Sequence, residues 1–410
     1  MRPIRRCALV LAALAFGIAQ AAVAPSLTAR HYAEDFDALS RAIESGYAYL
    51  DPARGEWSRT RQEWRARAAR ARTRPEFVAA LEGALGRLRD DHVVLSERTE
   101  QSPRRVPDDT DVWATFQGGA AVVEAVRTYG DADVAGVRPG HAITRIAGIP
   151  TERAVRQVLR GRDSANAAER DWALNHALAG PREGKLAVDV REPRGERTLE
   201  IERHAPRAAN GPPLIARRMG EDRDLGYIRV KAGLDDPRLP EQFDAALDHL
   251  KGTRALILDL REVGDASSHD GTRAILGRFA ARPSAWQARQ PPGARLVLDT
   301  VSPRGTHYGA PIVVLADRWT AGEGEALAAG LTAVANARLV GTRMAGLRGE
   351  LREARLPHSG IVVRYPGEKV FHVDGTPRER LRPHVPVYLA APNGGPGDPI
   401  LYQALKLLEK

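Results

Sequence analysis

The stretch Ala255-Leu256-Ile257-Leu258-Asp259-Leu260 decides the fold class of this chain. Apolar residues run through it without alternation, and turn-forming residues bound it on both sides. Such a run is typical of a strand that is buried on both faces, as in a parallel sheet. Parallel strands need long crossover connections, which are usually helices, so the stretch predicts a layered α/β domain.

Strand and helix patterns alternate along the chain on both sides of this stretch. The expected strands are residues 225–230, 311–316 and 337–340, and the expected helices are residues 242–250, 270–279 and 321–334. The alternation indicates an α/β domain over residues 215–405 with right-handed crossovers. In such sheets the chemistry lies beyond the carboxyl ends of the strands, which here are residues 259–264 and 317–325.

Residues 108–205 have a different character, with short β-type runs between Gly- and Pro-bearing turns. The sequence Ala135-Gly136-Val137-Arg138-Pro139-Gly140, followed by an apolar strand, resembles that of a β-rich PDZ module. The resemblance places Gly118, Gly119 and Ala120 at the carboxylate-binding loop of such a module. It implies that backbone N–H groups capture a peptide C-terminus while a sheet edge adds the peptide as a strand. A PDZ-shaped spacer that binds nothing is the alternative.

Residues 30–105 have a helical pattern, because Phe36, Leu39, Ile43 and Tyr47 recur at three- and four-residue spacing. We therefore expect an N-terminal helical bundle, in which the arginine-rich residues 59–74 form a solvated helix face. The last helix of this bundle leads directly into the sequence Arg89-Asp90-Asp91-His92.

The first residues have the pattern of a cleavable signal peptide, which we assign to residues 1–21. Basic residues precede an apolar run at 8–19 that is too short to span a bilayer, and the small residues Ala19 and Ala21 follow. Cleavage would also remove Cys7, the one cysteine, so the mature chain would have no disulfide. No later stretch has the length of a membrane span. We expect a periplasmic or secreted protein.

Composition and spacing exclude several other classes of function. The formal net charge is +9, but the arginines are scattered, and no basic cluster is interleaved with stacking aromatic residues. Nucleic-acid binding is therefore not expected. The histidines do not pair with one another or with acids at the spacing of a helix-borne zinc motif, so neither a metal nor another cofactor is expected. The sequence leaves the oligomeric state open.

The order of these three parts, together with several local motifs, resembles the tail-specific (carboxy-terminal-processing) serine peptidases, in particular their tricorn-core-like branch. The matching segments are residues 88–92, 256–262, 313–325 and 339–342, with a weaker match over residues 365–377. The resemblance implies the fold read from the residues: a helical bundle, a PDZ-like module and an α/β peptidase domain. It also implies a serine-type peptidase that acts on unstructured peptides or protein C-termini.

The resemblance also implies roles for particular residues. In that branch a serine opens a helix in the pattern Thr-x-Ser-x-x-Glu, and here Gly322 stands at the serine position and Glu325 at the acid. His92 matches the general base and Glu368 is the best match for the acid that orients it. Gly264 follows the Asp-Leu-Arg strand end, where relatives have the glycines of the oxyanion loop.

Three departures from the family pattern oppose hydrolysis. Gly322 has no oxygen or sulfur with which to form an acyl-enzyme. The other branch of the family uses a lysine in a Gly-Lys-Gly context, but Arg348 stands in that context here and is too basic to act as a base. Asp265 and Asp270 add negative charge to a loop that should stabilise an oxyanion.

These departures favour an impaired or inactive peptidase that binds peptides without cutting them. One alternative is an active peptidase with a relocated nucleophile, Ser267 or Ser268, or with a water activated by His92. Another is a non-catalytic carrier of apolar ligands on the same scaffold. His92 could also be a packed histidine or a partner of the helix dipole, and Glu325 an ordinary acid of a first helical turn.

Overall fold

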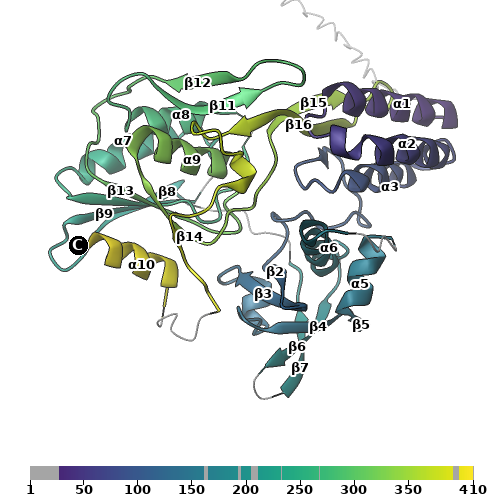
Figure 1. Ribbon diagram of the computed structural model, residues 1–410, viewed down its shortest axis with the longest axis horizontal. Coiled ribbons are helices and arrows are strands. Elements are labelled where there is room, and N and C mark those ends of the chain that lie inside the picture. Colours follow the sequence, from purple (N-terminus) through teal and green to yellow (C-terminus); the bar gives the residue numbers. More distant parts are fainter. Residues whose placement is uncertain are drawn as a thin grey trace, which may run out of the picture.

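The computed structural model describes residues 27–160, 165–192, 195–204, 211–231, 233–266, 268–390 and 397–409. The predicted signal peptide and Ser267 lie outside these residues. Three parts follow one another along the chain: N-terminal helices, a β-rich module and a C-terminal α/β domain (Figure 1). Within the described residues, no helix combines the length and the apolar character needed to cross a bilayer.

The predicted α/β fold class is confirmed by the sheet at the centre of the C-terminal domain. Its strands, in spatial order, are β17 (Val385–Pro386), β14 (Arg338–Gly341), β13 (Ile312–Ala316), β10 (Ala255–Asp259), β9 (Leu225–Val230) and β8 (Leu214–Met219). All neighbours are parallel except β8, which runs antiparallel to β9. Every residue of β10 is buried, as the unbroken apolar run predicts.

Helices cover both faces of this sheet (Figure 1). They are α7 (Leu239–His249), α8 (Asp270–Gly277) and α9 (Glu323–Ala335) on one face and α10 (Pro399–Leu408) on the other. Alternate residues of the strands serve the two faces: Leu256 and Leu258 join the larger core, whereas Ile257 packs with Ile400 and Ala404 of α10. The carboxyl ends of β10 and β13 therefore open onto the loops that precede α8 and α9.

A second sheet connects the C-terminal domain to the N-terminal helices. It contains β1 (Val94–Leu95), β16 (Val362–Phe371), β11 (Ser284–Gln290) and β12 (Val297–Val301), with β15 (Glu350–Arg355) also paired to β16. The N-terminal helices are α1 (Ala29–Gly46), α2 (Arg54–Ala68) and α3 (Arg74–Leu85), with short 3₁₀ turns at Asp51–Ala53 and Gly86–Leu88. Val363 and Tyr365 of β16 pack into the core of these helices. Residues far apart in sequence thus complete the bundle.

The β-rich module contains one sheet in the order β2-β3-β4-β6-β7, with β5 paired to β4. Its strands are β2 (Val112–Gln117), β3 (Ala120–Val126), β4 (Ala142–Ile146), β5 (Ile149–Pro150), β6 (Leu186–Glu192) and β7 (Gly195–Ile201); its helices are α4 (Asp131–Val134), α5 (Thr151–Val158) and α6 (Ala167–Ala179).

The predicted carboxylate-binding loop at Gly118, Gly119 and Ala120 is not what the structure contains. Gly118 and Gly119 form the tight turn of a hairpin, with φ of 56° and 85°, and Ala120 begins β3 directly opposite Gln117. Glycine adopts such positive φ values without steric cost. Because β3 is paired with β2 on one side and β4 on the other, it has no free edge for a peptide.

One edge strand of this sheet is β2, and α6 closes that edge. The amide of Ala114 donates to Oδ1 of Asn175 at 3.0 Å, and Nδ2 of Asn175 donates back to the Ala114 carbonyl at 2.9 Å. The amide of Phe116 donates to Oδ1 of Asp171 at 2.8 Å. Side chains of the module's own helix therefore occupy backbone groups that an added peptide strand would need.

Candidate active site

Gly322 lies at the tip of a sharp turn between β13 and α9, where it is the residue immediately before the helix. Its φ of 52° and ψ of −109° are a left-handed conformation that glycine tolerates and other residues adopt with strain. The turn is held by Thr320, whose hydroxyl donates to the Leu260 carbonyl at 3.0 Å. A strained strand-turn-helix corner is the arrangement that exposes the nucleophile in α/β-hydrolases.

The space beside Gly322 is filled by Asp265. A Cβ atom added to Gly322 would lie 2.2 Å from Oδ1 and 2.6 Å from Cγ of Asp265. A nucleophilic side chain at residue 322 would begin in this volume. At the position that the resemblance assigns to the nucleophile the chain therefore has a glycine, and a carboxylate fills the adjoining space.

His92 is buried and contacts the same carboxylate. Its Nε2 lies 3.4 Å from Oδ2 of Asp265, and its Nδ1 contacts the carbonyl oxygen of Arg348. Burial would lower the pKa of His92, but the contact with Asp265 outweighs burial and the pKa is raised. Burial would raise the pKa of Asp265, but the contact with His92 lowers it. The two residues thus stabilise each other as an imidazolium–carboxylate pair.

Gly264 and Glu325, two further predicted site residues, lie in the same corner. The carbonyl of Gly264 accepts a long 3.4 Å hydrogen bond from the amide of Gly324. The buried carboxylate of Glu325 accepts the amides of Gly322 at 3.1 Å, Gly346 at 2.9 Å and Leu347 at 3.0 Å. Burial raises the pKa of Glu325 to about 7. Glu325 therefore ties the first turn of α9 to the segment that supplies the Arg348 carbonyl.

Glu368 does not orient His92, contrary to what the resemblance implied. Its Oε2 lies 2.7 Å from Nη1 of Arg289 and its Oε1 lies 3.0 Å from Nη2 of Arg352. The Nδ1 of His92 is instead held by a backbone carbonyl. The local sequence match does not reveal these two ion pairs, which hold the Glu368 side chain against β11 and β15.

The relocated nucleophile is not supported at Ser268, the described member of the pair. Ser268 is exposed, and its hydroxyl accepts the amide of Asp270 at 3.3 Å. Arg348, at the lysine position of the other branch, points its guanidinium to Asp90 at 3.7 Å and over the ring of Tyr49. Neither residue therefore replaces the missing group.

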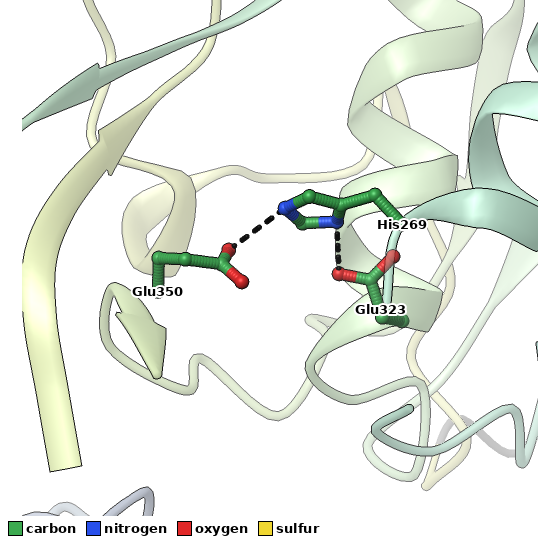
Figure 2. A group of neighbouring side chains, drawn as sticks. All are labelled: His269, Glu323 and Glu350. Atoms are coloured by element: carbon green, nitrogen blue, oxygen red, sulfur yellow. Dashed lines mark ion pairs between the residues drawn. The ribbon is translucent and has the colours of Figure 1, made fainter. Parts of the chain in front are cut away.

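The structure also brings together three candidate metal ligands that sequence spacing did not reveal. His269, Glu323 and Glu350 come from different elements, and within the described chain they form a group with metal-ligand chemistry (Figure 2). Nδ1 of His269 lies 2.7 Å from Oε1 of Glu323, and Nε2 lies 3.2 Å from Oε2 of Glu350. Burial opposes protonation of His269, but the two carboxylates outweigh it and raise its pKa to about 10.

A cavity of about 480 Å³ adjoins this corner and is bounded by all three parts of the chain. Tyr49 comes from the N-terminal region, Trp113 and Trp172 from the β-rich module, and Arg318 and Arg343 from the α/β domain. Of the residues predicted for catalysis, Glu325 lines the cavity, whereas Gly322 and His92 do not. The cavity is thus a binding space next to the corner.

Comparison with known proteins identifies one family and one fold. Residues 224–387 match the sequence model of peptidase family S41. No curated protein matches the chain. A photosystem II D1 C-terminal processing protease is 17% identical, with a TM-score of 0.56, over 90% of this chain and 99% of its own. Mature CPAF complexed with lactacystin is 15% identical, with a TM-score of 0.60, over 93% of this chain and 97% of its own.

Proposed function

We propose that this chain binds unstructured peptides or protein C-termini without cutting them, and that it is exported. The premise is that residues 224–387 are a peptidase family S41 domain. The predicted resemblance to the tail-specific serine peptidases is confirmed at the level of this family. Export rests on the pattern of residues 1–21.

The observation that carries the loss of hydrolysis is the carboxylate of Asp265 in the space beside Gly322. An acyl-enzyme needs a side-chain oxygen or sulfur at that place, and glycine supplies none. His92 is paired with Asp265, which raises its pKa against the effect of burial, so the residue holds its proton more tightly than a free general base would. The same carboxylate, that of Asp265, therefore fills the space of the nucleophile and pairs with the residue that matches the base.

The cavity beside the corner supports peptide binding. Its walls combine aromatic and charged side chains, which suits a peptide better than a wholly apolar ligand. Arg343 is exposed at the wall of the cavity, and among the described residues none forms an ion pair with it. A peptide C-terminal carboxylate is the partner that such a guanidinium lacks. One structural relative is by its name a C-terminal processing protease, which motivates the same ligand class here.

The test compares cutting and binding of fluorescein-labelled casein, an unstructured protein, by the purified protein. We expect no release of labelled fragments and a saturable rise in polarisation. Arg343→Ala should weaken binding of a labelled peptide with a free C-terminus by about tenfold, the loss expected for one charge-assisted pair. Arg191→Ala is the matched control, because that exposed arginine pairs with Glu196 on the remote β6–β7 hairpin.

One competing function has an observation in its favour. His92 and Asp265 form a dyad that could activate a water once His92 loses its proton. In that case casein would be cut, the rate would rise with pH, and His92→Ala would abolish it. This outcome would replace the proposed function with hydrolysis by activated water. Absence of both cutting and binding would reject both functions.

A further inference from the structure

We propose that His269, Glu323 and Glu350 bind a divalent transition-metal ion, with Zn²⁺ the expected ion. His269 immediately precedes α8, Glu323 is the first residue of α9, and Glu350 is the first residue of β15. The three side chains converge from separate elements, with the imidazole lying between the two carboxylates (Figure 2). This inference is independent of peptide binding and concerns a site that hydrolysis by a serine would not use.

The spacing of the ligand atoms fits a single ion after one side-chain movement. One ligand atom from each residue lies within 4.8 Å of the others. Tetrahedral zinc with bonds of about 2.0–2.1 Å separates its ligand atoms by about 3.3 Å. Nδ1 of His269 and Oε1 of Glu323 are 2.7 Å apart, so a slight opening of this pair admits the ion. Glu350, now at Nε2, has to turn toward Nδ1 to complete the set.

The structure indicates which carboxylate stays and which moves. The other oxygen of Glu323 accepts the hydroxyl of Thr272 at 2.6 Å, and its side chain is 5% exposed. Such a hydrogen bond to a ligating carboxylate is the usual outer-shell support of a metal site. Glu350 is 29% exposed and lies at a bulge in the pairing of β15 with β16. Glu323 is therefore the ligand that is already in place, and Glu350 is the ligand that moves toward the ion.

A second observation points to a ligand at the same place. Nδ1 of His269 is buried and makes no hydrogen bond within the described structure, although Glu323 is close. The carboxylate thus lies near the nitrogen but off the direction in which it could donate or accept. Nδ1 thus has an ion-pair partner but no well-directed hydrogen bond, and a metal that displaces the proton of His269 would bond to this nitrogen directly. The edge-on packing of Trp286 against the imidazole, with centroids 5.4 Å apart, fixes the ring.

The surrounding charge also favours a dication. The buried guanidinium of Arg378 interacts with four carboxylates, those of Glu325, Glu350, Glu323 and Asp265. Once a metal displaces the proton of His269, Arg378 and even a protonated His92 leave these four acids with a net negative charge. The imidazole nitrogen favours a transition metal over Mg²⁺ or Ca²⁺, and Zn²⁺ suits a site of three mixed nitrogen and oxygen ligands with an open fourth position.

The experiment titrates ZnCl₂ into chelator-treated full-length protein by calorimetry, and records the visible spectrum with Co²⁺ as a geometric probe. We expect one ion per chain, an intense Co²⁺ spectrum typical of four-coordination, and a rise in the unfolding temperature. Glu350→Gln should weaken binding by at least tenfold, and His269→Ala should abolish it. Glu353→Gln is the matched control, because this exposed glutamate on β15 pairs only with Arg364 among the described residues.

A competing surface site is available in the stacked pair His31 and His358, whose ring centroids are 4.5 Å apart. Zinc that is lost in His358→Ala and kept in His269→Ala would overturn the proposal, as would no binding to the wild-type protein. If circular dichroism shows that His269→Ala is unfolded, Glu350→Gln and Thr272→Val decide. Unchanged affinity in both of these variants would also reject the site.

Discussion

At the scale of single residues, the carboxylate of Asp265 determines whether a serine at residue 322 could work. A serine placed on the Gly322 backbone would put its Cβ 2.2 Å from Oδ1 of Asp265, so the Asp265 side chain would have to move from its present position. The φ of 52° adds a strain of about 1–3 kcal/mol for a residue with a side chain. A serine introduced at residue 322 alone therefore competes with the Asp265 side chain for the same space.

We predict that Gly322→Ser stays inactive toward labelled casein and is less stable than the wild type, whereas Gly322→Ser with Asp265→Gly cuts it. The second substitution removes the clash and frees Nε2 of His92 to accept the serine proton. The double variant should exceed Gly322→Ser by at least tenfold in initial rate. Asp265→Gly without the serine is the control and should remain inactive. Full activity of Gly322→Ser would show that Asp265 moves aside freely.

At the scale of elements, the turn between β13 and α9 depends on one partly buried acid, Asp317. Its Oδ1 accepts the amides of Trp319 and Thr320, both at 3.0 Å, and that of Glu262 at 3.3 Å. Burial raises the pKa of Asp317 to about 6. The folded state thus binds this proton more tightly than the unfolded state, and stability is lost as pH rises through the folded pKa.

We predict that Asp317→Asn removes the loss of folding stability that accompanies rising pH. All the hydrogen bonds go to Oδ1, so an asparagine oxygen in the same place can keep them while the buried charge disappears. Between pH 3 and pH 7 the free energy of unfolding of the variant, relative to the wild type, should rise by about 3 kcal/mol, since each pKa unit corresponds to about 1.4 kcal/mol. Urea unfolding at several pH values measures this slope. A difference that does not change with pH would contradict the raised pKa.

The contact between β2 and α6 is a second element-scale feature with a measurable consequence. Asn175 is buried and bonds to both the amide and the carbonyl of Ala114. We predict that Asn175→Ala costs about 2 kcal/mol of stability, because buried backbone groups lose their partners. Hydrogen exchange at Ala114 should accelerate, while exchange in β10 stays unchanged. Unaltered protection at Ala114 would mean that α6 is not what closes this edge.

The sequence predicts the elements of the central sheet well, because a strand that is buried on both faces is a mainly apolar run in its own sequence. The strand β13 is apolar throughout, β10 is apolar up to Asp259, and β9 carries one charged residue, Arg229. The sheet of β11, β12, β15 and β16 was not predicted, because its strands carry many charged residues that pair with one another across strands. Patterns along a single strand do not contain these pairs.

The residues of the candidate site likewise differ in whether the sequence alone predicts them. Gly322, Glu325 and His92 were found from motifs at strand and helix ends. The position of Asp265 beside Gly322 and the ion pairs of Glu368 depend on chain segments that meet only in the folded molecule. The same holds for His269, Glu323 and Glu350, which no sequence spacing relates.

At the scale of the whole molecule, the three parts of the chain are joined by a few partly buried polar contacts around the cavity. Asp91, next to His92, accepts Nε1 of Trp172 at 2.8 Å and contacts Nε2 of His176 at 2.6 Å, both from α6. From the α/β domain, Arg318 pairs with Glu124 of the β-rich module at 3.0 and 2.6 Å. The size of the cavity therefore depends on these joints as well as on its lining.

We predict that Arg318→Ala loosens the β-rich module from the α/β domain and weakens peptide binding by about tenfold. The arginine side chain is 7% exposed, pairs in bidentate fashion with Glu124 and lies over the ring of Trp113, so its removal opens one cavity wall. Hydrogen exchange in β2 and β3 should rise while the central sheet stays protected. Arg217→Ala, on β8 over Tyr227, is the control and should change neither property. If Arg318→Ala binds peptide as the wild type does, the N-terminal and α/β walls suffice, and the joint serves stability rather than binding.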